Sequence, residues 1–375
     1  MKQYEKVFFS AVRAAFWKTP VVVPEGFSEW GQVMALAKIQ TLTGLVGDVL
    51  MRTPEIRECL PAGLLSKLKM IPVQNLGSHN LLNSSLIKVV STLREAGVES
   101  VLLKGQGIAR YYPVPELRQC GDIDLYVGQE NYSRAYDALL PVVSGIDKRS
   151  ALEVGKHFHA ELGIVTVEVH RYVSQDSFRK QNEILQRYAY EGVTKDLKVF
   201  DFGGVPVNTP SDNFNVFFIF YHLWHHFING GIGLRQFCDW MMILHACHGS
   251  LSVDYLESIL TEMHLLKPWK ALGCVLVDYL GLPAEEMPLY DSRLSRKSAR
   301  ILKRVLREGN FGRQTAYGRK RTRHYIYEKL YSLMCHISRY FGLFFLFPEI
   351  ALREFGNTFR TGIVQVLNDL THLSK

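Results

Sequence analysis

The sequence predicts an α+β protein, in which a small mixed sheet with helices is flanked by helical regions on both sides. Apolar residues keep a helical period up to about residue 95, β-branched and alternating runs follow, and helical periods return after residue 208. We therefore expect a helical N-terminal region over 1–95, an α/β core over 96–208 and a helical C-terminal domain over 209–375.

The N-terminal region repeats apolar side chains every three or four residues, the period of a helix with one buried face. The clearest segments are Trp30, Val33, Met34 and Ala37, and then Leu82, Leu86, Val89, Val90 and Leu93. Gly97 follows the second segment at the position expected of a helix C-cap.

The central region has the shorter, alternating runs that are typical of strands. Strands are expected over 98–103, 122–127, 157–162 and 164–170, short helices over 108–112 and 131–140, and a hairpin over 199–207. Gly163 separates two of these strands, which predicts a tight turn between antiparallel partners.

Helical patterns return after Pro210, where Ser211 is a candidate N-cap. The clearest helices are expected over 214–227, 234–248, 255–263 and 269–280. Farther on, phenylalanines between 339 and 359 lie near arginines, which indicates either a helix packed in the core or an amphipathic membrane-surface helix. Pro348 interrupts the pattern and favours the core helix.

Composition excludes disorder, because 47% of the 375 residues are apolar and 21% are charged. No apolar run approaches the roughly 20 residues that a membrane-spanning helix needs. The first residues lack the features of a signal peptide. The six cysteines form no C-x-x-C pair, which is typical of scattered thiols in a reducing compartment and predicts a cytoplasmic protein.

Asp122 and Asp124 form a D-x-D pair within an expected strand. Residues i and i+2 of a strand point to the same face, so the two carboxylates project together. Such a pair is unfavourable unless a cation neutralises it, and Mg²⁺ (or Mn²⁺) prefers carboxylate oxygens and substrate phosphates. The pair therefore indicates metal-dependent phosphoryl or nucleotidyl transfer; the alternative is a strand end with two solvated acids.

Residues before and after the pair strengthen the functional interpretation. Lys104 and Gly105 follow an expected strand and precede an expected helix, where a flexible backbone and free N–H groups favour phosphate. Downstream, Glu168 and His170 share one face of another strand, and Glu168 would be a third acid for a metal or a proton. A plain tight turn and an exposed hairpin face are the alternatives.

Together these pieces resemble a bacterial group known as an uncharacterised nucleotidyltransferase family, within the polymerase-β-like nucleotidyltransferase superfamily. The resemblance spans about residues 30–300 and is carried by Leu103-Lys104-Gly105, Ala109, Tyr111-Tyr112-Pro113, Pro115, Leu117-Arg118, Gly121-Asp122-Ile123-Asp124-Leu125 and Val167-Glu168-Val169-His170. The superfamily usually places Gly-Gly or Gly-Ser before the acids, at a shorter distance. Here Lys104-Gly105 takes that place, so its phosphate turn is expected to work differently.

The resemblance implies a polymerase-β-like nucleotidyltransferase core. Asp122, Asp124 and Glu168 would hold one or two Mg²⁺ ions, and an NTP, with ATP the expected one, would bind near Lys104 and Gly105. An acceptor hydroxyl of a small molecule, sugar, protein or RNA would attack the α-phosphate, and pyrophosphate would leave. The alternative is a non-catalytic nucleotide-binding or regulatory protein on the same fold.

Two arginines are further nucleotide-binding candidates. Arg118 lies in the loop before the acids, where the resemblance implies a phosphate contact and structure alone implies an ion pair with a nearby acid. Arg235 is four residues before Asp239 on an expected helix, which permits an ion pair or a contact with the triphosphate.

Histidines give the remaining site candidates. His157, His159 and His170 lie on strands near Glu168 and are possible acceptor-site residues; a polar exposed strand face is the alternative. His222, His225 and His226 share a helix face and are expected to pack in the core or line a pocket.

A basic segment lies toward the C-terminus. Residues 293–323 contain twelve Lys or Arg residues and one acid, Glu308. The segment predicts either contact with a polyanion or a solvated helix face.

Overall fold

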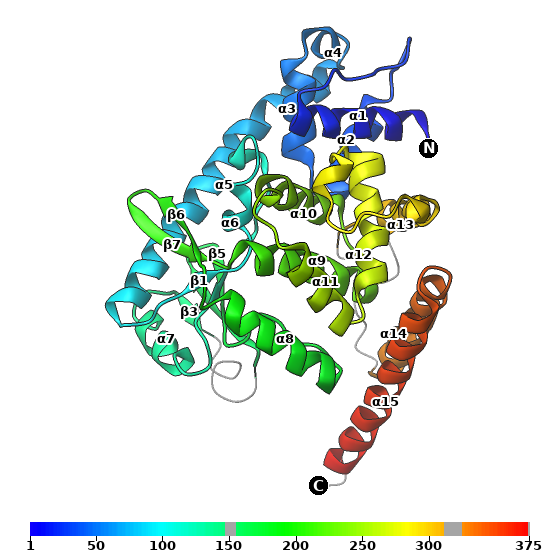
Figure 1. The fold of residues 1–375 in the computed structure, drawn as a ribbon. Helices are drawn as coiled ribbons and strands as arrows, with labels where there is room; N and C mark the ends of the chain where they lie inside the picture. Colours follow the sequence, from blue (N-terminus) through cyan, green and yellow to red (C-terminus); the bar gives the residue numbers. More distant parts are fainter. Residues whose placement is uncertain (147–154, 311–324, 374–375) are drawn as a thin grey trace.

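The computed structural model describes residues 1–146, 155–310 and 325–373 and confirms the α+β class, with a mixed sheet between helical regions (Figure 1). The N-terminal helices are α1 (Gln3–Trp17), α2 (Trp30–Ile39), α3 (Thr43–Arg52), α4 (Pro54–Glu58) and α5 (Ala62–Glu95). Gly97 caps α5 with a φ of +70°, and its N–H donates to the carbonyl of Arg94. The predicted C-cap is therefore confirmed.

The sheet has seven strands in the order β3-β4-β5-β2-β1-β7-β6. Their bounds are β1 (Val101–Leu102), β2 (Asp122–Tyr126), β3 (Gly145–Ile146), β4 (His157–Leu162), β5 (Val165–His170), β6 (Lys198–Phe202) and β7 (Val205–Thr209). The β2–β5 and β1–β7 pairs are parallel and the other pairs are antiparallel. A mixed sheet was expected, whereas the strand expected over 98–103 is reduced to two residues.

Short helices connect these strands. They are α6 (Gln106–Ala109), the 3₁₀ turn η1 (Pro115–Leu117), α7 (Tyr132–Leu139) and α8 (Arg179–Gly192). Gly163 has a φ of +63° at the turn between β4 and β5, as its position in the sequence predicts. No strand or helix was expected at β3 or α8, because neither has a strong apolar period.

The C-terminal helices include α9 (Asp212–Asn229), α10 (Leu234–Cys247), α11 (Val253–Glu262) and α12 (Leu266–Val275). They continue as η3 (Leu276–Leu280), η4 (Ala284–Glu286), η5 (Ser292–Leu294), α13 (Ser295–Glu308), α14 (Tyr325–Phe344) and α15 (Pro348–Leu373). The helix expected over 269–280 is confirmed, except that its last turn, η3, is π-helical. None of the described helices is long and apolar enough to cross a membrane.

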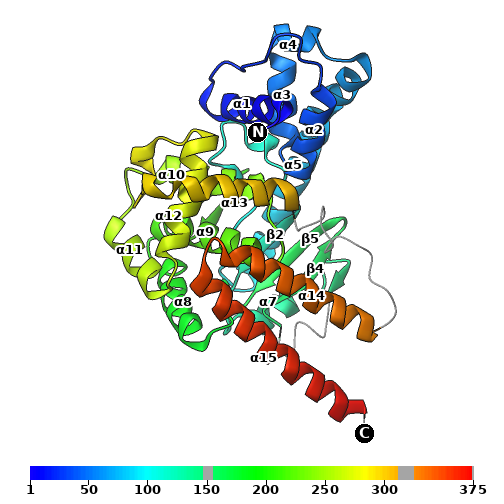
Figure 2. The same cartoon turned by 90° about the vertical axis from the view of Figure 1, so that its right-hand side faces the viewer.

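Helices α14 and α15 form a hairpin that projects from the body (Figures 1 and 2). Pro348 begins α15, so the interruption read from the sequence separates two helices. The inner side chains Leu343 and Phe347 belong to the core, as the core-helix interpretation predicts. Residues 311–323 of the predicted basic segment lie outside the described residues.

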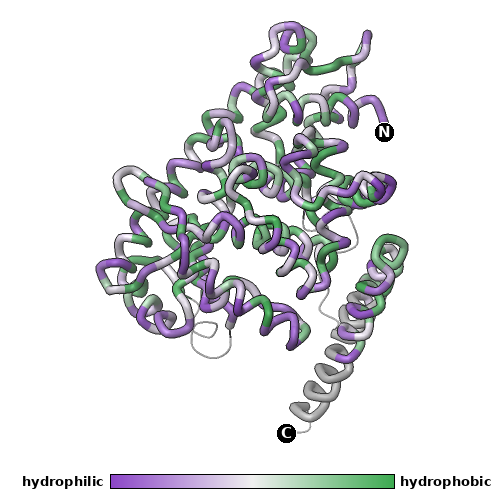
Figure 3. Tube along the Cα trace, viewed as in Figure 1, coloured by the Kyte–Doolittle hydropathy of each residue, from purple (hydrophilic) through white to green (hydrophobic). Residues whose placement is uncertain are grey.

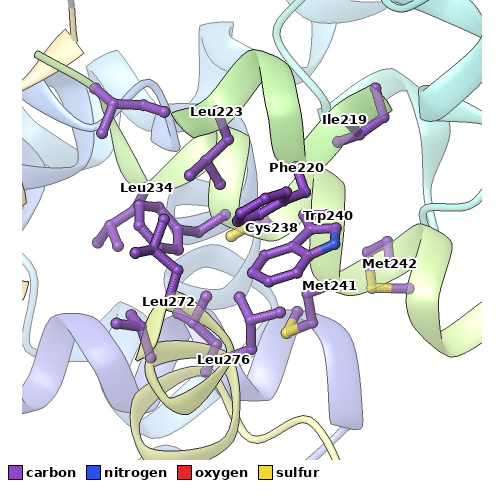
Figure 4. Close-up of a cluster of buried hydrophobic side chains, with 14 of the residues drawn as sticks. Ile219, Phe220, Leu223, Leu234, Cys238, Trp240, Met241, Met242, Leu272 and Leu276 are labelled. Atoms are coloured by element: carbon purple, nitrogen blue, oxygen red, sulfur yellow. The ribbon is translucent and has the colours of Figure 1, made fainter. Parts of the chain in front are cut away.

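Two hydrophobic clusters support this architecture. One lies between the sheet, α7 and the C-terminal half of α5, and includes Ile123, Leu125 and Val167. The larger one joins α1–α3 to α9, α10, α12 and α13, around side chains such as Phe220 and Trp240 (Figure 4). The N-terminal and C-terminal helices therefore share a core, and the three sequence ranges remain a proposed division.

Candidate functional site

The D-x-D pair and Glu168 lie on neighbouring parallel strands. Asp124 of β2 is the register partner of Glu168 of β5, and Tyr126 is the partner of His170. Neighbours in register project to the same face of a sheet, so the acids meet on one face with His170 beside them. The ligand atoms of Asp124, Glu168 and His170 all lie within 4.8 Å of one another. A single metal ion would be within reach of these three side chains.

Lys104 reaches the same acids from the turn after β1. Its Nζ lies 2.8 Å from Oδ1 of Asp124. The next residue, Gly105, has a φ of +57°, and a Cβ there would lie 3.1 Å from the carbonyl oxygen of Asp122. Gly105 therefore lets the turn approach β2 closely. Helix α6 has only four residues, so this turn and Lys104, more than a helix terminus, are the phosphate-binding candidates.

Burial and neighbouring charges shift the pKa values of the three acids. Burial opposes ionisation of Asp124, but the Lys104 charge and a hydrogen bond with His170 outweigh it and hold the pKa of Asp124 well below its usual value. Burial and the Asp124 charge raise the pKa of Asp122. The hydrogen bond with His170 lowers the pKa of Glu168 despite burial. The site therefore holds ionised carboxylates whose repulsion Lys104 and His170 reduce.

The pKa values of the two basic groups, Lys104 and His170, are raised. Burial opposes the charge of Lys104, yet the nearby charges of Asp124 and Asp122 raise the pKa of Lys104 overall. Burial also opposes the charge of His170, but its hydrogen bonds with Asp124 and Glu168 raise the pKa of His170. These counter-charges show that the pocket favours cations. The carboxylates match the oxygen donors that Mg²⁺ or Mn²⁺ take in proteins, whereas an imidazole is a donor that Zn²⁺ prefers.

A cavity of about 790 Å³ opens beside the acids. The sheet lines one wall, and α9 and α10 line the other. Its lining includes Lys104, Gly105, Arg118, Asp122, Asp124, His157, His159, Glu168, His170, His222, His225, His226 and Arg235. Every site residue predicted from the sequence therefore borders one space.

The predicted acceptor-site histidines take two different positions. His157 and His159 lie on β4, with their Nε2 atoms 3.1 Å apart, and each is within 4 Å of a Glu168 oxygen. They and Glu168 form a second group of possible metal ligands. His170 instead lies 3.1 Å from Oδ1 of Asp124 and 3.5 Å from Glu168. It orients the acids more directly than it lines an acceptor site.

The two predicted arginines separate in role. Arg118 is 6% exposed and forms a bidentate pair with Asp239, with distances of 2.7 and 2.8 Å. Its remaining nitrogen donates to Cys120. The helical ion pair between Arg235 and Asp239 allowed by the sequence is wrong, because Arg118 takes that carboxylate. Each guanidinium nitrogen of Arg118 already makes one of these bonds, which favours the ion pair over the phosphate contact.

Arg235 remains a candidate for binding phosphate. One of its nitrogens donates to the carbonyl of Gln119, and its Nε is buried with no hydrogen-bond partner. Its charge also lowers the pKa of Asp122, although burial of that acid is the larger effect. Arg235 therefore lies near the acids with an unused donor.

The opposite wall carries the α9 histidines, as the pocket-wall interpretation predicts. Burial lowers the pKa of His222 well below its usual value and the pKa of His226 to about 4. Burial also lowers the pKa of His225. The α9 part of this wall is therefore uncharged at neutral pH, in contrast to the charged wall of the sheet.

Some cavity residues had no signal in the sequence. Asn310 follows α13 and accepts a hydrogen bond from Gln236, and Lys156 and Tyr172 flank β4 and β5. Each is a common surface residue type with no motif around it. Only the folding of the chain brings them to the cavity.

Comparison with known proteins gives a family. The sequence pattern of the family described as "Uncharacterised nucleotidyltransferase" matches residues 27–281, which is more than half of this chain. No curated protein matches the chain. Among solved structures, the chain resembles an antigenic nucleotidyltransferase-like protein from Paracoccidioides brasiliensis at 13% identity, covering 57% of this chain and 96% of that chain with a TM-score of 0.34. A TM-score this low carries no argument.

Proposed function

This chain belongs to the uncharacterised nucleotidyltransferase family, and from that premise we propose that it transfers a nucleoside monophosphate from an NTP to an acceptor hydroxyl. Pyrophosphate is the second product. The observation that carries the proposal is the register of Asp124 with Glu168, which brings a third acid beside the D-x-D pair. A family match alone would not distinguish an intact site from a degenerate one.

The proposed metal is Mg²⁺ or Mn²⁺, held by Asp124 and Glu168, whose oxygens lie within 4.8 Å of one another. Asp122, the neighbouring carboxylate on the same face of β2, would complete the set of three acids. When bound, it supplies positive charge that offsets the charge developing on the phosphates. The fit rests on the ionised carboxylates, one of which is paired with the Lys104 ammonium at 2.8 Å. A divalent ion at Asp124 would take the place of this contact, because the two cations repel each other, and Lys104 would then pair with the phosphates.

The chain's own groups then bind and orient the reactants. Lys104 and the unused donor of Arg235 would hold the triphosphate of ATP or another NTP. Glu168 would accept the proton of the attacking hydroxyl on a carboxylate oxygen. His170 fixes Glu168 and Asp124 through its ring nitrogen. The uncharged wall of α9 would take the less polar part of the substrates.

The second candidate is a nucleotide-binding or regulatory protein without catalysis. It is favoured by the departure of Lys104-Gly105 from the superfamily's usual turn. Both candidates predict NTP binding, but only the enzyme predicts transfer of the labelled α-phosphate.

The test incubates the protein with Mg²⁺, α-labelled NTPs and a cell extract. Transfer of label is expected, and it should disappear in Asp122→Asn plus Asp124→Asn and fall at least about 100-fold in Glu168→Gln. Glu161→Gln is the matched control, because Glu161 is an exposed acid of β4 that does not line the cavity. NTP binding with no transfer would replace the enzyme with the binding protein.

A further inference from the structure

The α14–α15 hairpin exposes a row of large apolar side chains. On α14 they are Met334, Ile337, Phe341, Phe344 and Phe345, and on α15 they are Leu352, Phe355 and Phe359. Their spacing of three or four residues places them along one face of each helix. Phe341 is 67% exposed and its ring centroid lies 5.2 Å from that of Phe345. A contiguous exposed patch of this kind usually marks an interaction surface.

This patch is not the side by which the hairpin attaches to the body. Leu343 and Phe347 are buried on the inner side, where Phe347 packs edge-on against Trp224 at 5.3 Å. Arg339 is also buried and forms an ion pair with Glu308 at 2.9 Å. The hairpin therefore has a satisfied inner face and a second, uncovered apolar face.

Helix α13 carries a basic stripe next to this hairpin. Its exposed cations are Arg296, Arg300, Lys303 and Arg307, again spaced by three or four residues, and Arg293 precedes the helix in η5. The only acid of the helix, Glu308, is buried between Arg304 and Arg339. Arg296, Arg300 and Lys303 form no ion pair within the described residues. Their charge is therefore available to an outside partner.

Helix α13 contacts the turn of the hairpin. Lys297 of α13 donates to the carbonyl of Leu346 at 2.9 Å, and its Nζ lies 5.5 Å from the ring centre of Phe347. Helices α13, α14 and α15 all lie on the side turned toward the viewer in Figure 2. The hydrophilic colour of α13 adjoins the hydrophobic colour of the hairpin turn in Figure 3. We call this combined surface the basic–aromatic face.

We propose that the basic–aromatic face docks on the surface of an anionic lipid bilayer. Apolar side chains of an amphipathic helix enter the boundary between headgroups and acyl chains, and neighbouring cations bind anionic headgroups. The exposed phenylalanines supply the first interaction. Arg296, Arg300 and Lys303 supply the second. Membrane contact thus explains both features together.

Charge and chemistry disfavour two other occupants. A second copy packed by two-fold symmetry would bring two basic stripes toward each other, which opposes association. Nucleic acid would fit the stripe, but it would leave aliphatic side chains such as Ile337 and Leu352 in water. An anionic bilayer satisfies the cations and the aliphatic side chains at once.

The test is flotation of the full chain with phosphatidylcholine vesicles, with or without phosphatidylglycerol. We expect binding to the anionic vesicles and much weaker binding to the neutral ones. Neutralising the stripe with Arg296→Gln, Arg300→Gln and Lys303→Gln should reduce partitioning on the order of 100-fold. Phe341→Ser plus Phe345→Ser should also abolish flotation while thermal unfolding stays unchanged.

Matched controls come from α5, on the far side of the molecule in Figure 1. Lys67→Gln plus Lys69→Gln removes exposed charge there, and Met70→Ser plus Val73→Ser removes exposed apolar area. Neither should alter flotation. Equal binding to neutral and anionic vesicles, or no binding at all, would overturn the proposal. So would a dimer in solution that Phe341→Ser plus Phe345→Ser dissociates, or RNA binding without vesicle binding.

Discussion

The ammonium nitrogen of Lys104 lies 2.8 Å from Oδ1 of Asp124, whose side chain is only 1% exposed. A buried carboxylate needs a partner, because desolvation strongly disfavours its charge. Lys104 supplies that partner from a different strand connection. The pair therefore links the stability of the fold to the charge balance of the site.

Lys104→Met should lower the free energy of unfolding by about 3 kcal/mol in EDTA, because Asp124 loses its main counter-charge. Mg²⁺ or Mn²⁺ should restore part of this loss by replacing the missing charge. Denaturation in urea with and without the metal measures both effects. Lys156→Met is the control, since Lys156 lines the same cavity and forms no ion pair within the described residues. Equal losses in the two variants would contradict the prediction.

Gly105→Ala should destabilise the protein by about 1–3 kcal/mol, because an L side chain is strained at its φ of +57°. The added Cβ would also press on the carbonyl of Asp122. We therefore expect turnover to fall even where the loss of thermal stability is small. Gly121→Ala is the matched control, since no atom lies within 4 Å of a Cβ there. Thermal unfolding and turnover measured on both variants test the difference. Similar behaviour of the two would exclude a role for the turn.

Arg118 and Arg235 should respond differently to substitution. Arg118→Met leaves Asp239 buried and unpaired, so it should lower the free energy of unfolding by about 3–5 kcal/mol. Arg235→Gln should leave unfolding nearly unchanged and raise the KM for NTP about tenfold or more, because it removes a phosphate donor. Urea denaturation and steady-state kinetics separate the two outcomes. If only Arg235→Gln lowered the free energy of unfolding, Arg235 would be the structural arginine and Arg118 the phosphate-binding one.

His226 should make stability depend on pH. Its pKa of about 4 in the folded protein lies below the value of 6.5 expected when unfolded. The unfolded chain therefore binds the proton first, and this contribution to stability is present above pH 6.5 and is lost as the pH falls toward 4. At pH 5 the loss is about 2 kcal/mol. His226→Gln should flatten the stability curve in this window, and an unchanged curve would refute the burial argument.

Local patterns were sufficient for several elements of the fold. The alternation of β4 and β5 around Gly163, the period of α5 and the cap at Gly97 all depend on neighbours in the chain. The pairing of β1 with β7 depends on residues more than 100 positions apart, Val101 with Asn208. A two-residue strand such as β1 exists only because of such partners, so its bounds could not be predicted.

The acids were predictable for the same reason, because strand alternation fixes the direction of Asp122 and Asp124. The partner of Arg118 was not, since Asp239 lies 121 residues away and helical spacing pointed to Arg235 instead. The exposed apolar face of α14 could not be predicted either, because a phenylalanine-rich helix has the same sequence pattern in a core and at a surface. Long-range contact decides these cases.

The cavity separates the strands of the sheet cluster, which carry the acids, from the helical cluster, which carries the α9 histidines and Arg235. The distance between the acids and Arg235 therefore depends on how the sheet packs against the helical cluster. Each cluster can remain folded while a small slip between them widens the gap from the acids to Arg235. Substitutions in the packing between the sheet and the helical cluster, at residues that do not line the cavity, should accordingly lower activity while the protein stays folded.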